Sequence, residues 1–530
     1  MTATGAAGGA APHGAAASAQ GPDIRVLTAA ESAERDRATI AGGVPARALM
    51  QRAGAAAAAE ILSRYGERAA AGVAVFAGTG NNGGDAWVVA RALAAAGVPV
   101  RVCAPDEPRT DDARAEHDLA RAAFDPQPVR GDERVVVDGV LGTGTQGRPR
   151  GAGAEMIARM RRMRDGGAVV VALDVPSGLD ATLGAQEGAL RADCTLAFGA
   201  LKRGQLLARD LCGRLVLLDI GLAPTAPDEA PRLVTAAWVR AHLPAVTADA
   251  HKGTRRKVAI IGGAAGMAGA AVLAARAAMA SGAGMVRVIA EQPSVPVVQA
   301  SATAATTAAW PEDDASLDAS VCRWADAVVV GPGLGRSDDA HRLLERVLRR
   351  WHGPIVLDAD ALNAFAGRPD ALRALVGERA ALLTPHLAEF VRLAGGRLDD
   401  VRVHPYVSAL DLARRTGAGV LLKGVPTVVA APDGRRLVSA TGNPVLATAG
   451  SGDVLSGIAV TLVAQMGDAT HAGAAAAWVH GHAGDLAARR GPARGVTLEH
   501  VLAALSDAWP SATALRYPRL AELPAVGEDG

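Results

Sequence analysis

Short runs of consecutive apolar residues recur along the first 222 residues, and alanine-rich amphipathic stretches separate several of them. Runs of this kind are typical of strands buried on both faces of a parallel sheet. Their alternation with helices predicts an α/β domain with helices on both sides of the sheet. The predicted strands are residues 73–76, 98–102, 135–137, 169–173 and 194–198.

The same pattern starts again in the second half of the chain, which predicts a second α/β domain. Helices are expected over residues 268–281 and 338–351, and residues 454–490 are rich in Ala, Gly and Leu and predict packed helices. The predicted strands are residues 258–261, 286–289, 327–330, 355–357, 381–383 and 420–422.

Composition divides the chain into five expected segments. An Ala/Gly-rich start predicts a disordered tail, and a Pro/Ala-rich stretch beginning LAPTAPDEAP predicts a linker between the two domains. The segments are a tail over 1–22, a first domain over 23–222, a linker over 223–244, a second domain over 245–512 and a C-terminal tail over 513–530.

Charge and composition exclude some functions. Lys+Arg 55 and Asp+Glu 54 give a net charge of +1, and aromatic residues are only 3%, which argues against a nucleic-acid-binding protein. The four cysteines form no CxxC pair, which favours a reducing compartment. The uncharged run 258–275 contains several glycines and predicts a strand, turn and helix rather than a membrane span. We therefore expect a cytoplasmic protein without nucleic-acid or membrane partners.

Only four of the basic residues are lysines, namely Lys202, Lys252, Lys257 and Lys423. Lysine is a compact point charge on a slim stem, whereas arginine is a broad planar fork. In a chain so biased toward arginine, each lysine marks a candidate position that arginine would not fill.

Polar residues follow several predicted strands of the first domain. The motif GTGNNGGD (78–85) contains GxGxxG after a strand, which suits a phosphate at a helix N-terminus, although a simple tight glycine turn is the alternative. Asp138 and Asp174 each end a later strand, and Lys202 follows another. Because ligands bind at the carboxyl ends of strands in open α/β sheets, we expect a polar site there.

The second domain carries its strongest signal in AGSGD (449–453). Gly450, Ser451 and Gly452 can form a nest of N–H groups for a transferring phosphoryl group, and Asp453 can accept the proton of an attacking hydroxyl. The alternative is a helix-capping aspartate. The motifs GPGLG (331–335), VLDADALN (356–363), TPHLAEF (384–390) and LLKGVPT (421–427) accompany it.

The first domain resembles the NAD(P)H-hydrate epimerase family of the YjeF N-terminal type, through GTGNNGGD, VVVDGVLGTG and LDVPSG. The resemblance implies a Rossmann-like three-layer fold. It also implies a potassium ion at Asn82, Asp138 and Ser177, and Asp138, Asp174 and Lys202 as candidates for proton handling. The implied contacts to the hydrated dinucleotide are Asn81, Asn82, Gly83, Gly84, Asp85, Gly142, Thr143, Gly144, Thr145, Gln146, Gly147, Arg148 and Asp174.

The second domain resembles the ribokinase-like, ADP-dependent NAD(P)H-hydrate dehydratases, through HKG, GPGLG, DADALN, TPHLAEF, KG and GNPVLATAGSGDVLSG. The chain departs from that family at 267–270, where Met-Ala-Gly-Ala replaces Tyr-Thr-Gly-Ala. Asp453 is the implied catalytic base, and Glu389 resembles a magnesium-linked acid. The other implied residues are Ala270, Gly333 and His386 for the hydrated dinucleotide, with Asp453, and Lys423, Gly424, Val425, Pro426, Thr427 and Gly452 for the adenine nucleotide.

Both domains in this order resemble bifunctional NAD(P)H-hydrate repair enzymes. The resemblance implies epimerisation of the R and S hydrates of NADH and NADPH, followed by dehydration of the S form with ADP as phosphoryl donor, giving AMP and phosphate. The implied cofactors are K⁺ and Mg²⁺, and the implied partners are these small molecules and further copies of the chain, such as a tetramer.

Three alternatives remain from the residues alone. A ribokinase-like small-molecule kinase fused to a dinucleotide-binding domain would release a stable phosphorylated product. A nucleotide-sensing module would bind without turnover. An NAD-dependent oxidoreductase, suggested by GxGxxG alone, would change the redox state of the nicotinamide when a second substrate is added.

Overall fold

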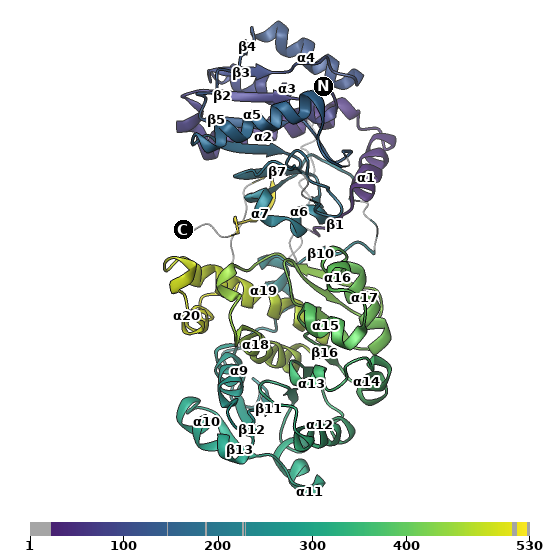
Figure 1. Cartoon of the computed structure of the whole chain (residues 1–530), viewed down its shortest axis with the longest axis vertical. Helices are drawn as coiled ribbons and strands as arrows, with labels where there is room; N and C mark the ends of the chain where they lie inside the picture. Colours follow the sequence, from purple (N-terminus) through teal and green to yellow (C-terminus); the bar gives the residue numbers. More distant parts are fainter. Residues whose placement is uncertain are drawn as a thin grey trace, which may run out of the picture.

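The computed structural model describes residues 23–145, 147–185, 188–224, 227, 229–510 and 517–526. The expected tail over residues 1–22 lies outside them. Two α/β domains are stacked along the long axis of the molecule, and α6, α7, β1 and β10 lie at their junction (Figure 1). The predicted α/β fold class is confirmed. In the described residues, no helix combines the length and hydropathy that a membrane span requires.

The first domain is built on one sheet, with all five predicted strands present within two residues of their expected bounds. Its strands are β2 (Val73–Ala77), β3 (Val100–Cys103), β4 (Gln127–Pro128), β5 (Val135–Gly139), β6 (Val169–Leu173), β7 (Cys194–Phe198), β9 (Arg214–Leu218) and β20 (Arg519–Leu523), with β1 (Val26–Leu27) and β8 (Leu201–Lys202) forming a separate parallel pair. Its helices are α1 (Ala29–Ala41), α2 (Ala46–Ala69), α3 (Asn81–Ala95), α4 (Asp111–Ala123), α5 (Gly151–Asp165), α6 (Arg203–Leu207) and α7 (Arg209–Cys212).

The order of this sheet among the described residues is β20-β9-β7-β6-β5-β2-β3-β4, and every neighbouring pair is parallel except β20 with β9. Apolar residues of α2 and α3 pack on one face, and those of α5, such as Met156 and Met160, pack on the other. Because both faces are covered, the strands are apolar at consecutive positions.

The second domain repeats this plan with more strands. They are β10 (Arg232–Leu233), β11 (Lys257–Gly262), β12 (Met285–Ala290), β13 (Thr306–Ala309), β14 (Ala327–Val330), β15 (Ile355–Leu357), β16 (Ala381–Leu383), β17 (Gly419–Leu422), β18 (Thr427–Ala430) and β19 (Arg436–Ser439). The helices are α8 (Ala236–His242), α9 (Ala268–Ala280), α10 (Val295–Ser301), α11 (Asp314–Leu317), α12 (Asp338–Arg350), α13 (Asp360–Asn363), α14 (Pro369–Val376), α15 (Leu387–Ala394), α16 (Leu398–Val403), α17 (Pro405–Thr416), α18 (Ser451–Met466), α19 (Ala469–Ala488) and α20 (Leu498–Ala504).

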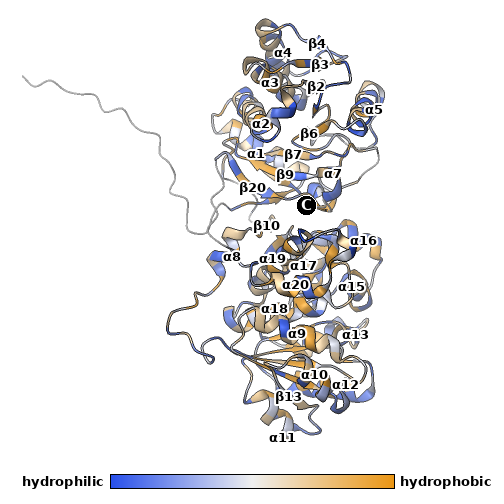
Figure 2. Cartoon of the chain, turned by 90° about the vertical axis from the view of Figure 1, so that its left-hand side faces the viewer, coloured by the Kyte–Doolittle hydropathy of each residue, from blue (hydrophilic) through white to orange (hydrophobic). Residues whose placement is uncertain are grey.

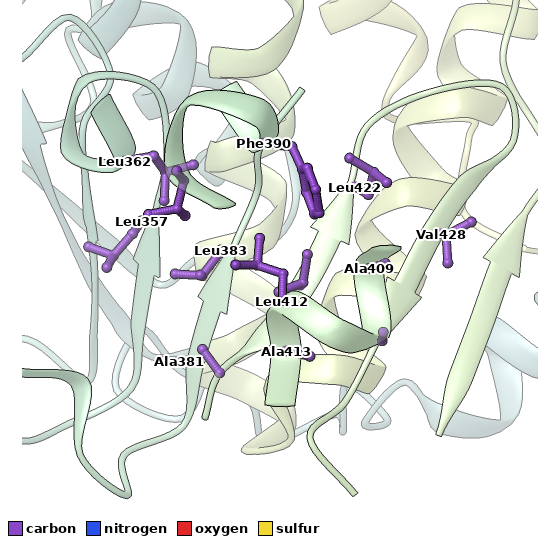
Figure 3. Packing of buried hydrophobic residues seen from close by; sticks show 14 of the residues in the cluster. Leu357, Leu362, Ala381, Leu383, Phe390, Ala409, Leu412, Ala413, Leu422 and Val428 are labelled. Carbon is purple, nitrogen blue, oxygen red and sulfur yellow. The ribbon is translucent and has the colours of Figure 1, made fainter. Parts of the chain in front are cut away.

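Within the described residues, the strand order of the second sheet is β10-β19-β18-β17-β16-β15-β14-β11-β12-β13. Strands from β13 to β17 are parallel, whereas β18 pairs antiparallel with both of its neighbours. The sheet is mostly hydrophobic (Figure 2), with α9, α18 and α19 on one face and α12, α15 and α17 on the other. Leu357, Leu383 and Leu422 of three neighbouring strands pack with Phe390 and Leu412 of the covering helices (Figure 3).

The two segments expected to be a linker and a tail both contain strands. Residues 223–244 include β10, which pairs with β19, and the Leu233 N–H donates to Ile24 O of the first domain at 2.8 Å. The C-terminal segment includes β20, which returns to the first domain and pairs with β9. β10 has only two residues, and the sequence RLAEL of β20 does not alternate apolar and polar residues, so neither strand gives a periodic signal.

Charged groups hold β20 in place. Glu522 accepts from Arg64 at 3.1 and 2.9 Å and from Arg214 at 3.0 Å, and Arg519 donates to the buried Glu60 at 2.9 Å. An apolar cluster that contains Leu201, Leu233 and Leu523 continues into the core of the second domain. The C-terminal segment is therefore part of the joint between the domains.

We predict that Glu522→Gln loosens this edge of the first sheet. The change removes the carboxylate that Arg64 and Arg214 share, while Arg64 keeps its pair with Glu60, at a cost of about 1–3 kcal/mol. Hydrogen exchange of the β9 amides should accelerate accordingly. Glu499→Gln is the matched control, because Glu499 pairs with Arg276 on the surface. This substitution should not measurably change hydrogen exchange in β9. Unchanged β9 protection in Glu522→Gln would contradict this account.

Candidate active sites

The first site begins where two glycine-rich loops press together. A side chain at Gly83 would place its Cβ 1.9 Å from Gly78 O, and one at Gly78 would place its Cβ 2.0 Å from Val140 O. Only glycine permits this approach of backbone to backbone. Gly80 caps α3, which begins at Asn81, so the polar motif lies in the first turn of the helix. The loops after β2 and β5 therefore form one surface.

Asp138, Ser177 and Asn82 gather around the backbone of Leu141. Ser177 donates to Asp138 through its N–H (2.8 Å) and its hydroxyl (2.6 Å), and its Oγ accepts from the Leu141 N–H at 2.9 Å. Asn82 Nδ2 donates to Leu141 O at 3.1 Å, while its buried Oδ1 has no hydrogen-bond partner among the residues that the structure describes. Burial raises the pKa of Asp138 to about 6, against the lowering effect of its hydrogen bonds to Ser177 and Val140.

Asp174 and Lys202 form a buried ion pair at the same end of the sheet. The Lys202 ammonium, 1% exposed, donates to Asp174 Oδ1 and to Phe198 O at 3.3 Å. Asp174 has a positive φ of 61°, and its carbonyl accepts from Gln205 Nε2 at 2.6 Å. The strained backbone and the side-chain contacts fix the carboxylate at the strand end.

Two more acids surround this pair. Burial, followed by the charges of Asp174 and Asp36, raises the pKa of Asp85 well above its usual value. Burial also raises the pKa of Asp36, which Lys202 partly offsets. Sequence reasoning missed Asp36 because it lies in α1, and the pairing of Leu27 with Lys202 brings that helix to the site.

The remaining predicted residues of the first site lie on the loop before α5. Gly142 approaches Asn82, because a Cβ on Gly142 would lie 3.2 Å from Asn82 Cβ, and the Thr145 N–H donates to Gly142 O at 3.2 Å. Gln146 lies outside the described residues. Thr143 is half-buried, and the exposed members of this loop are Gly144, Gly147 and Arg148.

The second site is a cavity of about 840 Å³ at the carboxyl ends of β15, β16 and β17. The predicted residues that line it are His386, Glu389, Lys423, Gly424, Val425, Pro426, Thr427, Gly452 and Asp453. Ala270 and Gly333 lie together outside this lining, since a Cβ on Gly333 would lie 3.0 Å from Ala270 Cβ. The structure therefore separates the predicted dinucleotide contacts into His386 and Asp453 in the cavity and Ala270 and Gly333 beside it.

A second buried lysine–aspartate pair organises the cavity. Lys423 Nζ donates to Asp358 Oδ1 at 2.9 Å and lies 3.9 Å from Glu389 Oε2, and Ser456 Oγ donates to Asp358 Oδ2 at 2.7 Å. Burial alone would raise the pKa of Asp358, but Lys423 and Ser456 lower it below its usual value. Burial would lower the pKa of Lys423, but Asp358 and Glu389 raise it.

Asp453, unlike Asp358, forms no ion pair with any residue that the structure describes. Burial, followed by the charge of Asp358, raises its pKa to about 7 despite the opposing effect of Lys423. It lies in the first turn of α18, which Gly450 caps in the left-handed conformation at φ 90°. A carboxyl that titrates near neutrality beside helix N–H groups suits proton transfer to or from an anionic substrate.

His386 and Glu389 have a structural role that sequence reasoning did not assign. The His386 N–H donates to Glu389 Oε2 at 2.9 Å, and His386 Nδ1 accepts from the Ala388 and Glu389 N–H groups at 3.1 and 3.3 Å. Both residues therefore cap α15 while they line the cavity. His480 is a lining residue that was also missed; its Nε2 lies 3.2 Å from Ser451 Oγ, and burial lowers its pKa to about 4.

Comparison with known proteins adds independent information. Residues 258–506 match the family described as NAD(P)H-hydrate dehydratase, and residues 46–204 match the YjeF-related protein N-terminus. The fold and the two sites thus define a two-domain α/β enzyme that joins these two families.

Full-length relatives carry both domains. Bifunctional NAD(P)H-hydrate repair enzyme Nnr of Salinibacter ruber is 38% identical over 93% of this chain and 96% of its own length. The Escherichia coli protein of the same name is 34% identical over 87% of this chain and 89% of its own. The ADP/ATP-dependent NAD(P)H-hydrate dehydratase of Bacillus subtilis, co-crystallised with ATP/Mg²⁺, is 30% identical, with a TM-score of 0.47 over 52% of this chain and 96% of that one. The chain belongs to the family of bifunctional NAD(P)H-hydrate repair enzymes.

The raised pKa of Asp453 predicts a pH-dependent gain in stability for Asp453→Asn. Folding raises this pKa from its usual 3.8 to about 7, so the wild type loses stability as the pH rises through that window, whereas asparagine does not titrate. The melting temperature of Asp453→Asn should exceed that of the wild type at about pH 8 and match it more closely at about pH 4. Asp507→Asn, an exposed change, is the control. Equal differences at both pH values would refute the assignment.

Proposed function

We propose that this chain returns hydrated NADH and NADPH to the intact reduced cofactors in two steps. The first site interconverts the R and S hydrates, and the second site dehydrates the S form while ADP is converted to AMP and phosphate. The observation that carries the proposal is the near-neutral carboxyl of Asp453 at the start of α18, facing a cavity with a buried Lys423–Asp358 pair.

The dehydration chemistry follows from these groups. Asp453 takes the proton of the C6 hydroxyl while the hydroxyl oxygen bonds to the terminal phosphorus of ADP. The bond between that phosphorus and the bridging oxygen breaks, which releases AMP. The N–H groups of the first turn of α18 stabilise the charge on the transferring group. The ring nitrogen then expels phosphate from C6, and loss of a proton from C5 restores the double bond.

The described residues offer no dense cluster of acidic side chains for a magnesium ion. Glu389 is engaged as a helix cap, and the described residues contain no group of three or more His, Cys, Asp or Glu side chains that could hold a metal ion. These residues do not fit a resident magnesium site. We propose that magnesium enters with the nucleotide phosphates, with Glu389 as the acid predicted to lie beside it.

The first site supports a division of labour among its acids. Asp138 is occupied by the Ser177 N–H, the Ser177 hydroxyl and the Val140 N–H. We assign it to positioning the loops, and we assign proton handling at the substrate to Asp174 and Lys202. The unpartnered Asn82 Oδ1, with Asp138 and Ser177, fits a potassium ion, which would balance the charge of the dinucleotide phosphates there. Assembly into oligomers and a cytoplasmic location remain predictions.

The dehydratase proposal predicts a specific pH profile. When purified enzyme is mixed with both epimers of hydrated NADH, Mg²⁺ and ADP, the absorbance of reduced nicotinamide should return. Without ADP the reaction should not proceed. Asp453→Asn should lower kcat by about 10²–10⁴-fold, since it removes the proton acceptor. For the wild type, kcat/KM should fall as the pH drops below about 7, because protonated Asp453 cannot accept a proton. Phosphorylation without return of reduced cofactor would favour the small-molecule kinase instead.

The epimerase proposal predicts a biphasic time course for Asp138→Ala. Loss of the loop-positioning carboxylate should leave one epimer to be dehydrated at the normal rate, after which the reaction slows to spontaneous epimerisation. Lys202→Met should behave in the same way, because it removes the partner of Asp174. The rate of the fast phase is the internal control, since it depends on the second site alone. A single fast phase that consumes both epimers in either variant would exclude that residue.

A further inference from the structure

One cation at the second cavity comes from the first domain. Arg209, the first residue of α7, lines the cavity together with Val526 of the C-terminal segment. Figure 1 shows α7 directly above the second domain. The side chain is 2% exposed, and its Nη2 donates to Pro524 O. The first domain and the chain's last described residues thus close one end of this cavity.

The remaining donors of Arg209 are unused. Its Nε and Nη1 are buried and have no hydrogen-bond partner among the described residues. Burial lowers the pKa of Arg209, and the charges of Cys212 and Asp485 oppose this. Asp485 does not satisfy these donors, because no hydrogen bond joins the two side chains and its Oδ2 accepts from the Gly442 N–H at 3.2 Å. Buried guanidinium donors without partners are costly, which points to a ligand that supplies acceptors.

The position of Arg209 indicates which part of a nucleotide it would meet. The phosphate end of the cavity is marked by Gly452, where a Cβ would lie 3.2 Å from Lys423 Nζ. Arg209 lies instead toward Asp485, which binds the Gly442 amide, and Gly442 packs beside Gly481. A nucleotide with its phosphates at Gly450–Gly452 leaves its nucleoside to fill the rest of the cavity, which Arg209 lines.

We infer that Arg209 of the first domain is a nucleotide-binding residue of the second domain. Its Nε–H and Nη1–H donate to acceptors of the nucleoside, either ring nitrogens of the base or oxygens of the ribose. The inference rests on the proposed function only in taking this cavity as the ADP site. The first domain then completes the nucleotide pocket of the second.

The test is calorimetric titration of the full chain with ADP and with AMP. Arg209→Met keeps the bulk of the side chain but removes the donors. It should weaken the binding of both ADP and AMP by about tenfold or more. In the assay, KM for ADP should rise while kcat at saturating ADP is retained. Arg209→Lys keeps the charge without the planar fork, and its affinity for ADP should lie between those of the wild type and Arg209→Met. Unchanged epimerase activity in Arg209→Met confirms that the first domain is folded.

Arg214→Gln is the matched control, because it removes the ion pair between Arg214 of β9 and Glu522 of β20, and Arg214 does not line the cavity. It should leave ADP affinity unchanged; an equal loss in Arg214→Gln would assign the effect to ordering of the C-terminal segment and overturn the inference. Wild-type affinity in Arg209→Met, or a loss for ADP but not for AMP, would overturn it too.

Titration with 2′-deoxy-ADP distinguishes an acceptor at the ribose 2′ position from acceptors elsewhere on the nucleoside. If the Arg209→Met effect disappears with this ligand, the donors face the ribose, and if it persists, they face the base or another ribose oxygen; both results support a nucleoside contact. If the wild type binds ADP but does not convert hydrated NADH to NADH, the proposed function fails, while the ADP and AMP affinities of the variants still test Arg209. If turnover is normal and Arg209→Met binds ADP as wild type does, only this inference fails.

Discussion

A buried lysine paired with a strand-end aspartate is the interaction on which each site depends. Lys202 pairs with Asp174 after β6, and Lys423 pairs with Asp358 after β15. A lysine without its partner could not remain charged in such a place, and each aspartate would in turn be an uncompensated charge. Two of only four lysines in an arginine-rich chain form these pairs, where a compact ammonium group on a slim stem suits a single carboxylate.

In each pair the paired aspartate compensates the lysine charge, so burial still raises the pKa values of the neighbouring acids. Asp453 lies beside the Lys423–Asp358 pair and titrates near neutrality, and Asp36 and Asp85 near Lys202 have raised pKa values for the same reason. In the second cavity, burial and pairing therefore give two kinds of acid, namely Asp358, whose pKa Lys423 lowers, and Asp453, whose pKa is raised. Asp453, the second kind, suits proton transfer, whereas Asp358 belongs to the fixed electrostatic frame; at the first site the proposed proton handling stays with Asp174 and Lys202.

Sequence patterns predicted the parts of the fold whose signal is local. Consecutive apolar runs identified β6, β7, β14, β15 and β16 at their observed bounds, because strands covered on both faces have no polar positions. The glycine motifs and strand-end acids likewise indicated both sites. Asp36 and Arg209 could not be found in this way, because ordinary helical positions become site positions only through tertiary packing. His386 and Glu389 were found, but their capping of α15 was not, although the spacing of three residues is that of a capping box.

The strand β20 shows what distant pairing does to such a chain. Glu522 binds Arg214 across a sequence separation of 308 residues, so the first sheet gains its last strand only after the second domain has been made. Ordering this segment costs conformational entropy, which the ladder with β9 and the ion pairs with Arg64 and Arg214 offset. Contacts of such high order form late in folding. The segment that follows β20 runs directly to the cavity of the second domain, where Pro524 accepts from Arg209 and Val526 joins the lining. The same late contact thus completes the sheet of one domain and one wall of the cavity in the other.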